Sequence, residues 1–444
     1  MRKKSLLILP FAGLLALLTF CDRTGADGPL ALQDRSNLPM EERYLNFHDT
    51  VAYVGMEACI PCHPNVHATF QHNGMGMSFD KATKEKSAAQ FGEHALVYDS
   101  VSNFYYKPFW KGDSLMVQEY RLDGADTIHQ RTEYISYIIG SGHHTNSHMV
   151  DFEGYVYQAP ITFYTQKEQW DMAPGFAGGF NSRFTRLINM ECMTCHNALP
   201  EHVEGSVNKY AHVPQGINCE RCHGPGELHV KTKMAGQLVD TSVHPDFTIV
   251  NPADLSVDLQ MNLCQRCHLQ GVAVLNEGSF WDDFKPGMHL KEVMQVFLPE
   301  YKGAGAEDQF LMASHVERLK ESECFVAGEL SCITCHNPHV SVRVSQQNHF
   351  NAACVDCHRG TQRDSCTEEI QQRILANNND CSGCHMPKSA SIDIPHVAIT
   401  DHNIRIPDKA EQYRETLEGK KVREAIEFVG LRCMTDDAPS ALTM

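Results

Sequence analysis

The hydrophobic pattern begins with one apolar run near the N-terminus and then breaks into short segments. Residues 2–4 are basic and residues 6–18 are mostly apolar. A basic start followed by a short apolar stretch is typical of an export signal, and the stretch is too short to span a bilayer comfortably. We therefore predict a signal peptide over residues 1–20, followed by a polar tether over residues 21–50.

Four runs of aromatic and β-branched residues follow between residues 91 and 170. They are residues 97–98, 104–106, 115–117 and 134–139, and turns at residues 111–113, 123–124 and 153–154 punctuate this region. Such runs bounded by Gly and Asp are typical of strands joined by hairpins. We predict a β-rich insert over residues 91–170, folded as an antiparallel meander.

The remainder of the chain lacks strong periodicity. Residues 271–305 are punctuated by Gly and Pro, with a helix expected to start near residues 288–292. Charge spacing and helix propensity over residues 408–429 predict that the C-terminal tail, residues 406–444, is helical. Outside the insert we expect mostly α-helical and irregular backbone.

The pattern Cys-x-x-Cys-His occurs seven times. It is typical of c-type haem attachment, in which both thiols bind the porphyrin covalently and the His is the proximal iron ligand. Zinc and dithiol sites need no His after the second Cys, so seven copies leave little room for them. We number the motifs 1 to 7 in chain order and predict seven covalently attached haem c groups. The attachment residues are Cys59 and Cys62, Cys192 and Cys195, Cys219 and Cys222, Cys264 and Cys267, Cys332 and Cys335, Cys354 and Cys357, and Cys381 and Cys384, and the proximal ligands are His63, His196, His223, His268, His336, His358 and His385.

The motif spacing predicts the domain organisation. Motif 1 falls in residues 51–90, motifs 2–4 in residues 171–300 and motifs 5–7 in residues 301–405. A few tens of residues cannot cover both faces of a haem, so neighbouring haems must cover one another. The predicted fold is a multihaem cytochrome c, mostly α and irregular, with a haem-filled core and the β-meander inserted between haems 1 and 2.

Histidine is abundant enough to supply second axial ligands. The chain has 25 His, and the seven proximal residues leave eighteen. The candidate distal ligands are His72, His202, His229, His315, His339, His396 and His402, and for each the alternative is a solvated or core histidine. The short offset from His336 to His339 predicts that His339 serves a neighbouring haem. His143, His144 and His148 are open to a haem, a substrate pocket or neither.

Four of the 18 Cys lie outside the motifs. Cys21 ends a segment that resembles a bacterial lipobox and is our candidate lipidation site, although Phe20 departs from the small residue usual there; the alternative is ordinary cleavage nearby. Cys324 and Cys366 are candidates for a disulfide in an oxidising compartment. Cys433 is left over as a free thiol.

The formal net charge is −17. An acidic protein of this kind repels nucleic acid and anionic lipid surfaces. The charge suits either attraction of a basic redox partner or plain solubility. No nucleic-acid partner is expected.

Several segments together resemble the exported multihaem cytochromes c of the cytochrome c-552/4 and hydroxylamine-oxidoreductase-like group. They are residues 53–72 around motif 1, 216–226 around motif 3, 330–339 around motif 5, and 400–402; residues 139–142 and 170–176 look like segments of related cytochromes, some of which contain tetratricopeptide repeats. The resemblance implies stacked parallel and perpendicular haem pairs, mostly with two His ligands. By position it implies distal roles for His72, His229, His315, His339 and His402. Seven motifs depart from the four or eight common in that group.

Three functions fit these features. The leading hypothesis is an electron relay, exported to the periplasm or cell surface and lipid-anchored through Cys21. Its partners would be redox donor and acceptor proteins, with a quinol oxidoreductase or an outer-membrane complex as candidates. The second is a reductase or oxidase of a small nitrogen or sulfur compound at one five-coordinate haem, although no catalytic residue is assigned. The third is a subunit of a larger cytochrome assembly.

Overall fold

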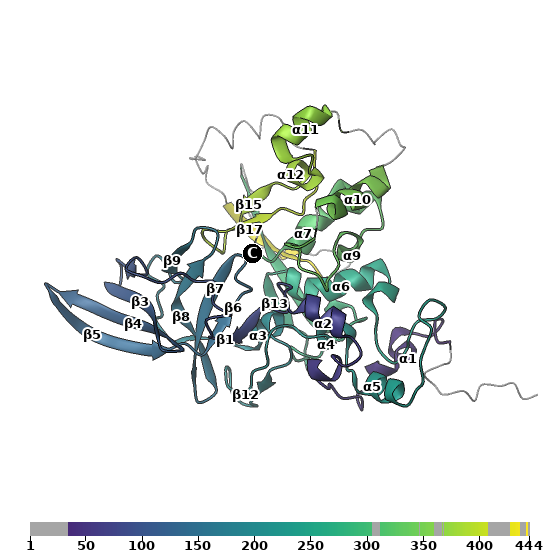
Figure 1. Cartoon of the computed structure of the whole chain (residues 1–444), viewed down its shortest axis with the longest axis horizontal. Helices are drawn as coiled ribbons and strands as arrows, with labels where there is room; N and C mark the ends of the chain where they lie inside the picture. Colours follow the sequence, from purple (N-terminus) through teal and green to yellow (C-terminus); the bar gives the residue numbers. More distant parts are fainter. Residues whose placement is uncertain are drawn as a thin grey trace, which may run out of the picture.

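A computed structural model describes residues 34–303, 311–345, 347–358, 366, 368–406, 427–435 and 441–442. The predicted signal peptide and Cys21 lie outside these residues. Figure 1 shows the sheets of the β-rich insert on one side of the molecule and most of the helices on the other. Motif 2 meets the β-rich part and the other motifs lie among the helices.

The β-rich insert forms two antiparallel sheets rather than one meander. One sheet has four strands in chain order, and the other has β9 beside β8 and the path β1-β6-β7-β8-β10. The first consists of β2 (Val97–Asp99), β3 (Phe104–Lys111), β4 (Ser114–Asp123) and β5 (Asp126–Tyr134), and the second of β1 (Phe79–Lys81), β6 (Tyr137–Ile139), β7 (Thr145–Phe152), β8 (Tyr155–Tyr164), β9 (Gln169–Met172) and β10 (Arg186–Leu187). Alternate residues of β4, including Leu115 and Val117, are fully buried in one hydrophobic cluster with Ile161 and Phe163 of β8. The insert therefore has a core of its own.

A third sheet lies in the part of the chain where we expected helix and irregular backbone. Its four antiparallel strands are β13 (Val272–Leu275), β14 (Met294–Lys302), β17 (Glu427–Cys433) and β18 (Ala441–Leu442). The helix expected near residues 288–292 is only the single turn η5 (Leu290–Glu292). The prediction of a helical tail is wrong for residues 427–433, because hydrogen bonding to β14 outweighs local propensity there; residues 407–426 lie outside the described residues.

The helices are short and several end at a motif. They are α1 (Met40–Arg43), α2 (Pro64–Phe70), α3 (Met190–His196), α4 (Glu220–His223), α5 (Glu227–Met234), α6 (Val257–His268), α7 (His315–Lys320), α8 (Glu323–Ala327), α9 (Cys332–Cys335), α10 (Gln347–His358), α11 (Ile370–Asn377) and α12 (Cys381–His385), with single turns η2 (Leu45–Phe47), η3 (Met56–Ala58) and η4 (Pro252–Asp254). Two small hairpins pair β11 (Glu201–His202) with β12 (Tyr210–His212) and β15 (Lys388–Ala390) with β16 (Ala398–Thr400).

The predicted tether is shorter than expected. Tyr44 is 1% exposed and lies in a hydrophobic cluster with Phe247 and Val250. The N–H of Leu45 donates to the carbonyl of Phe247 at 2.8 Å. The aromatic and apolar residues of this segment therefore anchor it to the body of the protein, and residues 40–47 do not form a free linker.

Two hydrophobic clusters join the sheets to motif helices. Met190 and Met193 of α3 pack with Phe79, Met149 and Val156 of the six-stranded sheet. In the other cluster, Met261 of α6 packs with strand β14 and helix α7. The six-stranded sheet thus positions motif 2, and the third sheet positions motif 4.

Candidate haem sites

All motifs except the first have their two cysteines within or at the start of a helical turn. Motif 1 instead follows η3, and its histidine precedes α2. Cysteines three positions apart lie on the same helix face, with the motif histidine directly after them. The local backbone thus suits two bonds to one porphyrin edge and one bond to its iron.

Motifs 2, 3 and 4 are in direct contact. The Arg266 side chain of motif 4 donates to the Thr194 hydroxyl of motif 2 at 2.8 Å, and the Arg221 side chain of motif 3 donates to the Thr194 carbonyl at the same distance. The Cys267 sulfur lies 3.9 Å from the Thr194 carbonyl oxygen. Haems bound at these three motifs would therefore share one compartment.

The buried carboxylate of Glu220 in motif 3 binds the segment that precedes motif 1. This carboxylate accepts hydrogen bonds from the backbone N–H groups of Val54, Gly55 and Gly226, each at 2.8 Å. Glu220 is 2% exposed and follows Cys219 directly. The segment before motif 1 is therefore fixed against the helix of motif 3.

The remaining motifs continue the series. Helix α6 of motif 4 contacts α9 of motif 5, where the Cys332 sulfur lies 3.9 Å from the Met261 sulfur. Helix α10, which contains motif 6, contacts both α9 of motif 5 and α12 of motif 7. The contacts therefore link the motifs in the order 1, 3, 2, 4, 5, 6, 7.

Three pairs of imidazoles have the separation expected for two ligands on one iron. Metal–imidazole bonds of about 2.1 Å place the two ring centres roughly 6 to 6.5 Å apart. The observed ring centres are 6.4 Å apart for His63 and His229, 6.0 Å for His223 and His339, and 6.2 Å for His336 and His402. The residues present therefore fit haem, which would supply redox-active iron when bound.

A fourth pair is closer. The ring centres of His268 and His315 are 5.3 Å apart at 88°, and those of His315 and His402 are 4.8 Å apart. The Nδ1 atom of His315 is buried without a hydrogen-bond partner, which leaves it available to another group. Burial lowers the pKa of His402 to about 4, so this imidazole is neutral at pH 7, as iron coordination requires.

Several of these rings are oriented through Nδ1. The distances from Nδ1 to a backbone carbonyl oxygen are 2.8 Å from His223 to Val250, 2.8 Å from His385 to Arg405 and 3.0 Å from His402 to Thr400. His229 instead uses the side chains of Thr248 and Asp246, at 3.0 and 3.2 Å. A donor bond at Nδ1 leaves Nε2 as the ligand atom, which is the usual arrangement for metal-binding histidines.

A buried ion pair joins the helix that contains His315 to the loop that contains His402. Arg318, in the same helix as His315, donates to Asp401 at 2.9 and 2.7 Å. Their side chains are only 5% and 1% exposed. Burial opposes ionisation of Asp401, but the hydrogen bonds from Arg318 and Asn403 are strong enough to lower its pKa.

The other candidate distal histidines lie elsewhere. His72 is exposed, and His229 rather than His72 faces His63. His202 is exposed in a hairpin and contacts Tyr210, and His396 bonds to Asp171 at 2.7 Å. The structure therefore places none of these three beside a proximal histidine.

The three histidines of the Gly/Ser-rich turn have different surroundings. His144 accepts from the Gln166 side chain at 2.9 Å, and the His143 carbonyl accepts from Arg343 at 2.9 Å. His148 is fully buried, with its ring stacked on Trp170 at 4.9 Å. His148 is therefore a residue of the insert's core.

The three described cysteines outside the motifs are not bonded to one another. Cys324 and Cys366 are both free, so their predicted disulfide has no support from the geometry. Cys433 is buried, and its thiol lies 3.1 Å from the Gln295 side-chain oxygen. Cys433 is therefore a satisfied core thiol.

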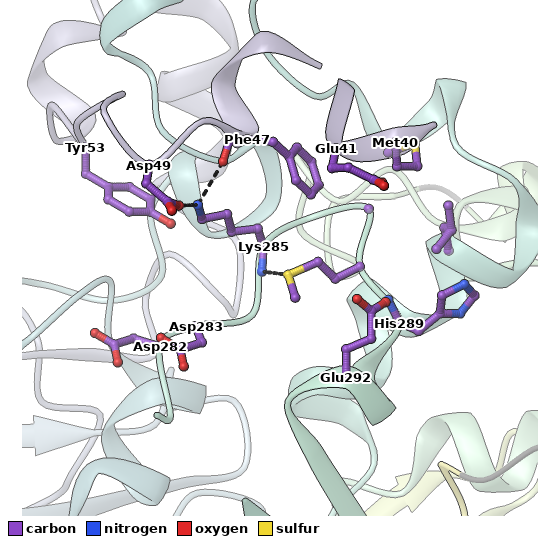
Figure 2. A pocket seen from close by; sticks show the side chains of 13 residues that line it. Met40, Glu41, Phe47, Asp49, Tyr53, Asp282, Asp283, Lys285, His289 and Glu292 are labelled. Atoms are coloured by element: carbon purple, nitrogen blue, oxygen red, sulfur yellow. Dashed lines mark hydrogen bonds and ion pairs between the residues drawn. The ribbon is translucent and has the colours of Figure 1, made fainter. Parts of the chain in front are cut away.

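One cavity of about 850 Å³ lies between the N-terminal segment and residues 282–292. Figure 2 shows Lys285 reaching across it to the Phe47 carbonyl and the Asp49 carboxylate, at 3.0 and 2.9 Å. The other charged residues of its lining are mainly acidic: Glu41, Asp282, Asp283 and Glu292. None of the lining residues is a motif cysteine or histidine.

None of the helices in the described part of the chain has the length and hydropathy of a transmembrane span. Within those same residues, no three His, Cys, Asp or Glu side chains are grouped to bind a bare metal ion.

Repeated Cys-x-x-Cys-His motifs in mutual contact, with paired imidazoles, define a multihaem c-type cytochrome. A family model described as "Cytochrome c554 and c-prime" matches residues 166–224, which include motifs 2 and 3. The chain is also 24% identical over 180 residues to the multiheme cytochrome MtrA of Shewanella baltica (strain OS185). These findings confirm the resemblance to multihaem cytochromes c that the sequence predicts. The second match covers 38% of this chain and 51% of that protein, so it spans about half the relative's length.

Two solved structures are also similar. The outer cell wall cytochrome OcwA aligns over 80% of this chain and 79% of its own, with 15% identity and a TM-score of 0.43. The undecaheme cytochrome from the S-layer of Carboxydothermus ferrireducens aligns over 80% of this chain and 52% of its own, with 17% identity and a TM-score of 0.36.

Sequence reasoning missed the residues that join the motifs. Arg221, Arg266 and Thr194 occupy the same variable position of their motifs, and Glu220 occupies the position before it. A charged residue inside an attachment motif was the available signal. Its partners, which lie up to 166 positions away, could not be inferred from spacing.

Proposed function

We propose that the mature protein is an exported heptahaem c-type cytochrome that relays electrons through closely spaced haems, most of them with two His ligands. The observation that supports this proposal is the unbroken contact among the seven motifs. Each motif touches at least one other, so no haem would stand alone. Electrons entering at one end of the series could reach the other without leaving the protein.

The chain's own residues would hold each haem in a defined way. The motif cysteines would hold the porphyrin, and the motif histidines would ligate iron on one face. His229, His339, His315 and His402 are the proposed second ligands for motifs 1, 3, 4 and 5. Covalent attachment and two axial imidazoles give low-spin iron suited to electron transfer.

A haem count with intact mass tests the proposal. A pyridine haemochrome assay on the secreted full-length protein should give seven haems per chain. The intact mass should include seven haems, together with acyl chains if Cys21 anchors the protein to a membrane as we propose. A colourless secreted protein with free motif thiols would end the proposal, and a haem-loaded protein without acyl chains would end only the lipid anchor.

A second candidate function is suggested by motif 2. Among the described residues, no second imidazole is in ring contact with His196, nor with His358 or His385 of motifs 6 and 7. Motif 2 is singled out because burial lowers the pKa of His196 to about 4, and the charges of His268 and Lys86 act in the same direction. An iron bound there with an open sixth position could reduce or oxidise a small nitrogen or sulfur compound.

Two measurements separate the candidates. Electron paramagnetic resonance of the oxidised protein should show mainly low-spin iron if the protein is a relay. A large high-spin signal, together with turnover of nitrite, hydroxylamine or sulfite by a reduced dye, would favour the enzyme. High-spin iron without turnover on any of them would leave the relay with one open haem.

A further inference from the structure

Motifs 3 and 4 are distinguished by an arginine inside the attachment sequence. Arg221 and Arg266 stand directly before the second cysteine of their motifs. The other motifs have an uncharged residue there, apart from Asp356 of motif 6, which is exposed. Positive charge at this position is therefore confined to the motifs that contact motif 2.

The Arg266 side chain is buried between motifs 4 and 2. It is 7% exposed, and one terminal nitrogen donates to the Thr194 hydroxyl at 2.8 Å and to the Trp281 carbonyl at 2.6 Å. The other terminal nitrogen lies 3.9 Å from the Cys195 sulfur, which is an attachment atom of motif 2. The Nε atom is buried without a partner. The guanidinium therefore lies directly against the edge where a porphyrin would be bonded.

Arg221 approaches the same place from motif 3. Its side chain donates to the Thr194 carbonyl at 2.8 Å. The acceptors found for both arginines within the described residues are a hydroxyl, carbonyl oxygens and a sulfur, all of them neutral. Glu191 is near enough to feel the Arg266 charge, yet it forms no ion pair with it. Glu220 is bonded to backbone N–H groups instead.

Two cations, Arg266 buried and Arg221 half-buried, thus approach Thr194 without a carboxylate bonded to either. In a buried region the effective dielectric constant is far below that of water, and a cation favours any nearby group that gains negative charge. Addition of an electron to a haem is such a gain. Local charge and burial are recognised levers on haem potential.

We propose that Arg221 and Arg266 raise the reduction potentials of the haems held by motifs 2, 3 and 4. Arg221 and Arg266 would act on these haems through their positive charge and would take no part in breaking or forming bonds. This inference rests on the proposed function, because it requires haem at these motifs.

Spectroelectrochemical titration of the full-length haem-loaded protein tests the inference. R266M should make reduction of at least one haem about tenfold less favourable, which is about 59 mV for one electron. R221M should shift a central haem in the same direction. R266K retains the charge but not the paired hydrogen bonds, so its potentials should stay near those of the wild type. R131M is the control, because Arg131 lies in β5 beside Glu133, within the insert.

The outcomes separate charge from structure. Wild-type potentials in both R266M and R221M would overturn the proposal, as would an equal shift in R266K and R266M. If R266M fails to take up haem, R221M decides; if both fail while R266K and R221K mature, the arginines serve folding and the proposal is wrong. A wild-type protein with fewer than seven haems would count against the proposed heptahaem relay, and one without haem would refute it independently of the arginines.

Discussion

Replacing Asp401 with Asn should destabilise the part of the protein that presents His315 and His402. In the wild type, the Asp401 carboxylate accepts two hydrogen bonds from Arg318 and one from the N–H of Asn403. D401N removes the negative charge and leaves the buried guanidinium with Glu321, at 2.7 Å, as a remaining acidic partner.

The size of the expected loss of stability follows from the burial of the Arg318–Asp401 ion pair. Removing one partner of a buried ion pair costs about 3–5 kcal/mol, because the other charge is left uncompensated. Glu321 retains part of that compensation, so we expect a loss of about 3 kcal/mol, near the lower end of that range. This is a large fraction of the roughly 5–15 kcal/mol by which a typical domain is stable.

The pH dependence has a definite sign. The pKa of Asp401 is lowered in the folded protein, because the hydrogen bonds from Arg318 and Asn403 outweigh the opposing effect of burial. Its contribution to stability is therefore fully present above the unfolded pKa of about 3.9 and is lost as the pH falls through the lower folded value. The difference between wild type and D401N should shrink over that acidic range.

Guanidinium unfolding at pH 7, followed by far-UV circular dichroism of the haem-loaded protein, measures the loss. D113N is the matched control, since the Lys84–Asp113 pair has a similar length, 2.8 Å, but its side chains are 52% and 97% exposed. No measurable loss is expected for D113N. A loss below about 1 kcal/mol for D401N, the size expected of a surface pair, would refute the reasoning.

Three further predictions concern motifs 1 and 3. E220A removes a charged acceptor shared by three backbone N–H groups, and at about 1.5 kcal/mol for each such bond it should cost roughly 4.5 kcal/mol. Hydrogen exchange should rise at Val54 and Gly55 but stay normal in the exposed control E57Q. H229A should convert the haem of motif 1 to high spin in electron paramagnetic resonance, whereas H72A should leave the spectrum unchanged; the opposite result would restore His72 as the ligand. H339A should convert the haem of motif 3 to high spin, because the His339 ring lies beside His223. A spin change confined to the haem of motif 5 would contradict the ring geometry.

The motifs and the insert were accessible from sequence because their signals are local. Attachment needs two cysteines and a histidine at fixed spacing, and runs of aromatic and β-branched residues bounded by turns, such as residues 104–106, mark strands. The contact of His339 with a motif other than its own was also foreseeable, because the three positions that separate it from His336 are too few to reach around a haem.

The distal partner of motif 1 was not accessible in the same way. His72 was favoured by nearness in sequence, yet His229 occupies the place opposite His63. The choice between them depends on how α5 packs, which no spacing rule specifies. The prediction of a helical C-terminal tail was wrong for a related reason. Residues 427–433 have no strong strand pattern, and they form a strand because β14 offers an edge to pair with.

The tie between Glu220 and Val54 spans 166 positions. A polypeptide that crosses a membrane from its N-terminus delivers motif 1 long before Glu220 and His229 arrive to complete its surroundings. The earliest haem would thus be attached to an unfinished site, and the first segment would gain its final shape only after the third motif has been translocated. On the export route that we propose, assembly of the first haem site would therefore be slower than its position at the front of the chain suggests.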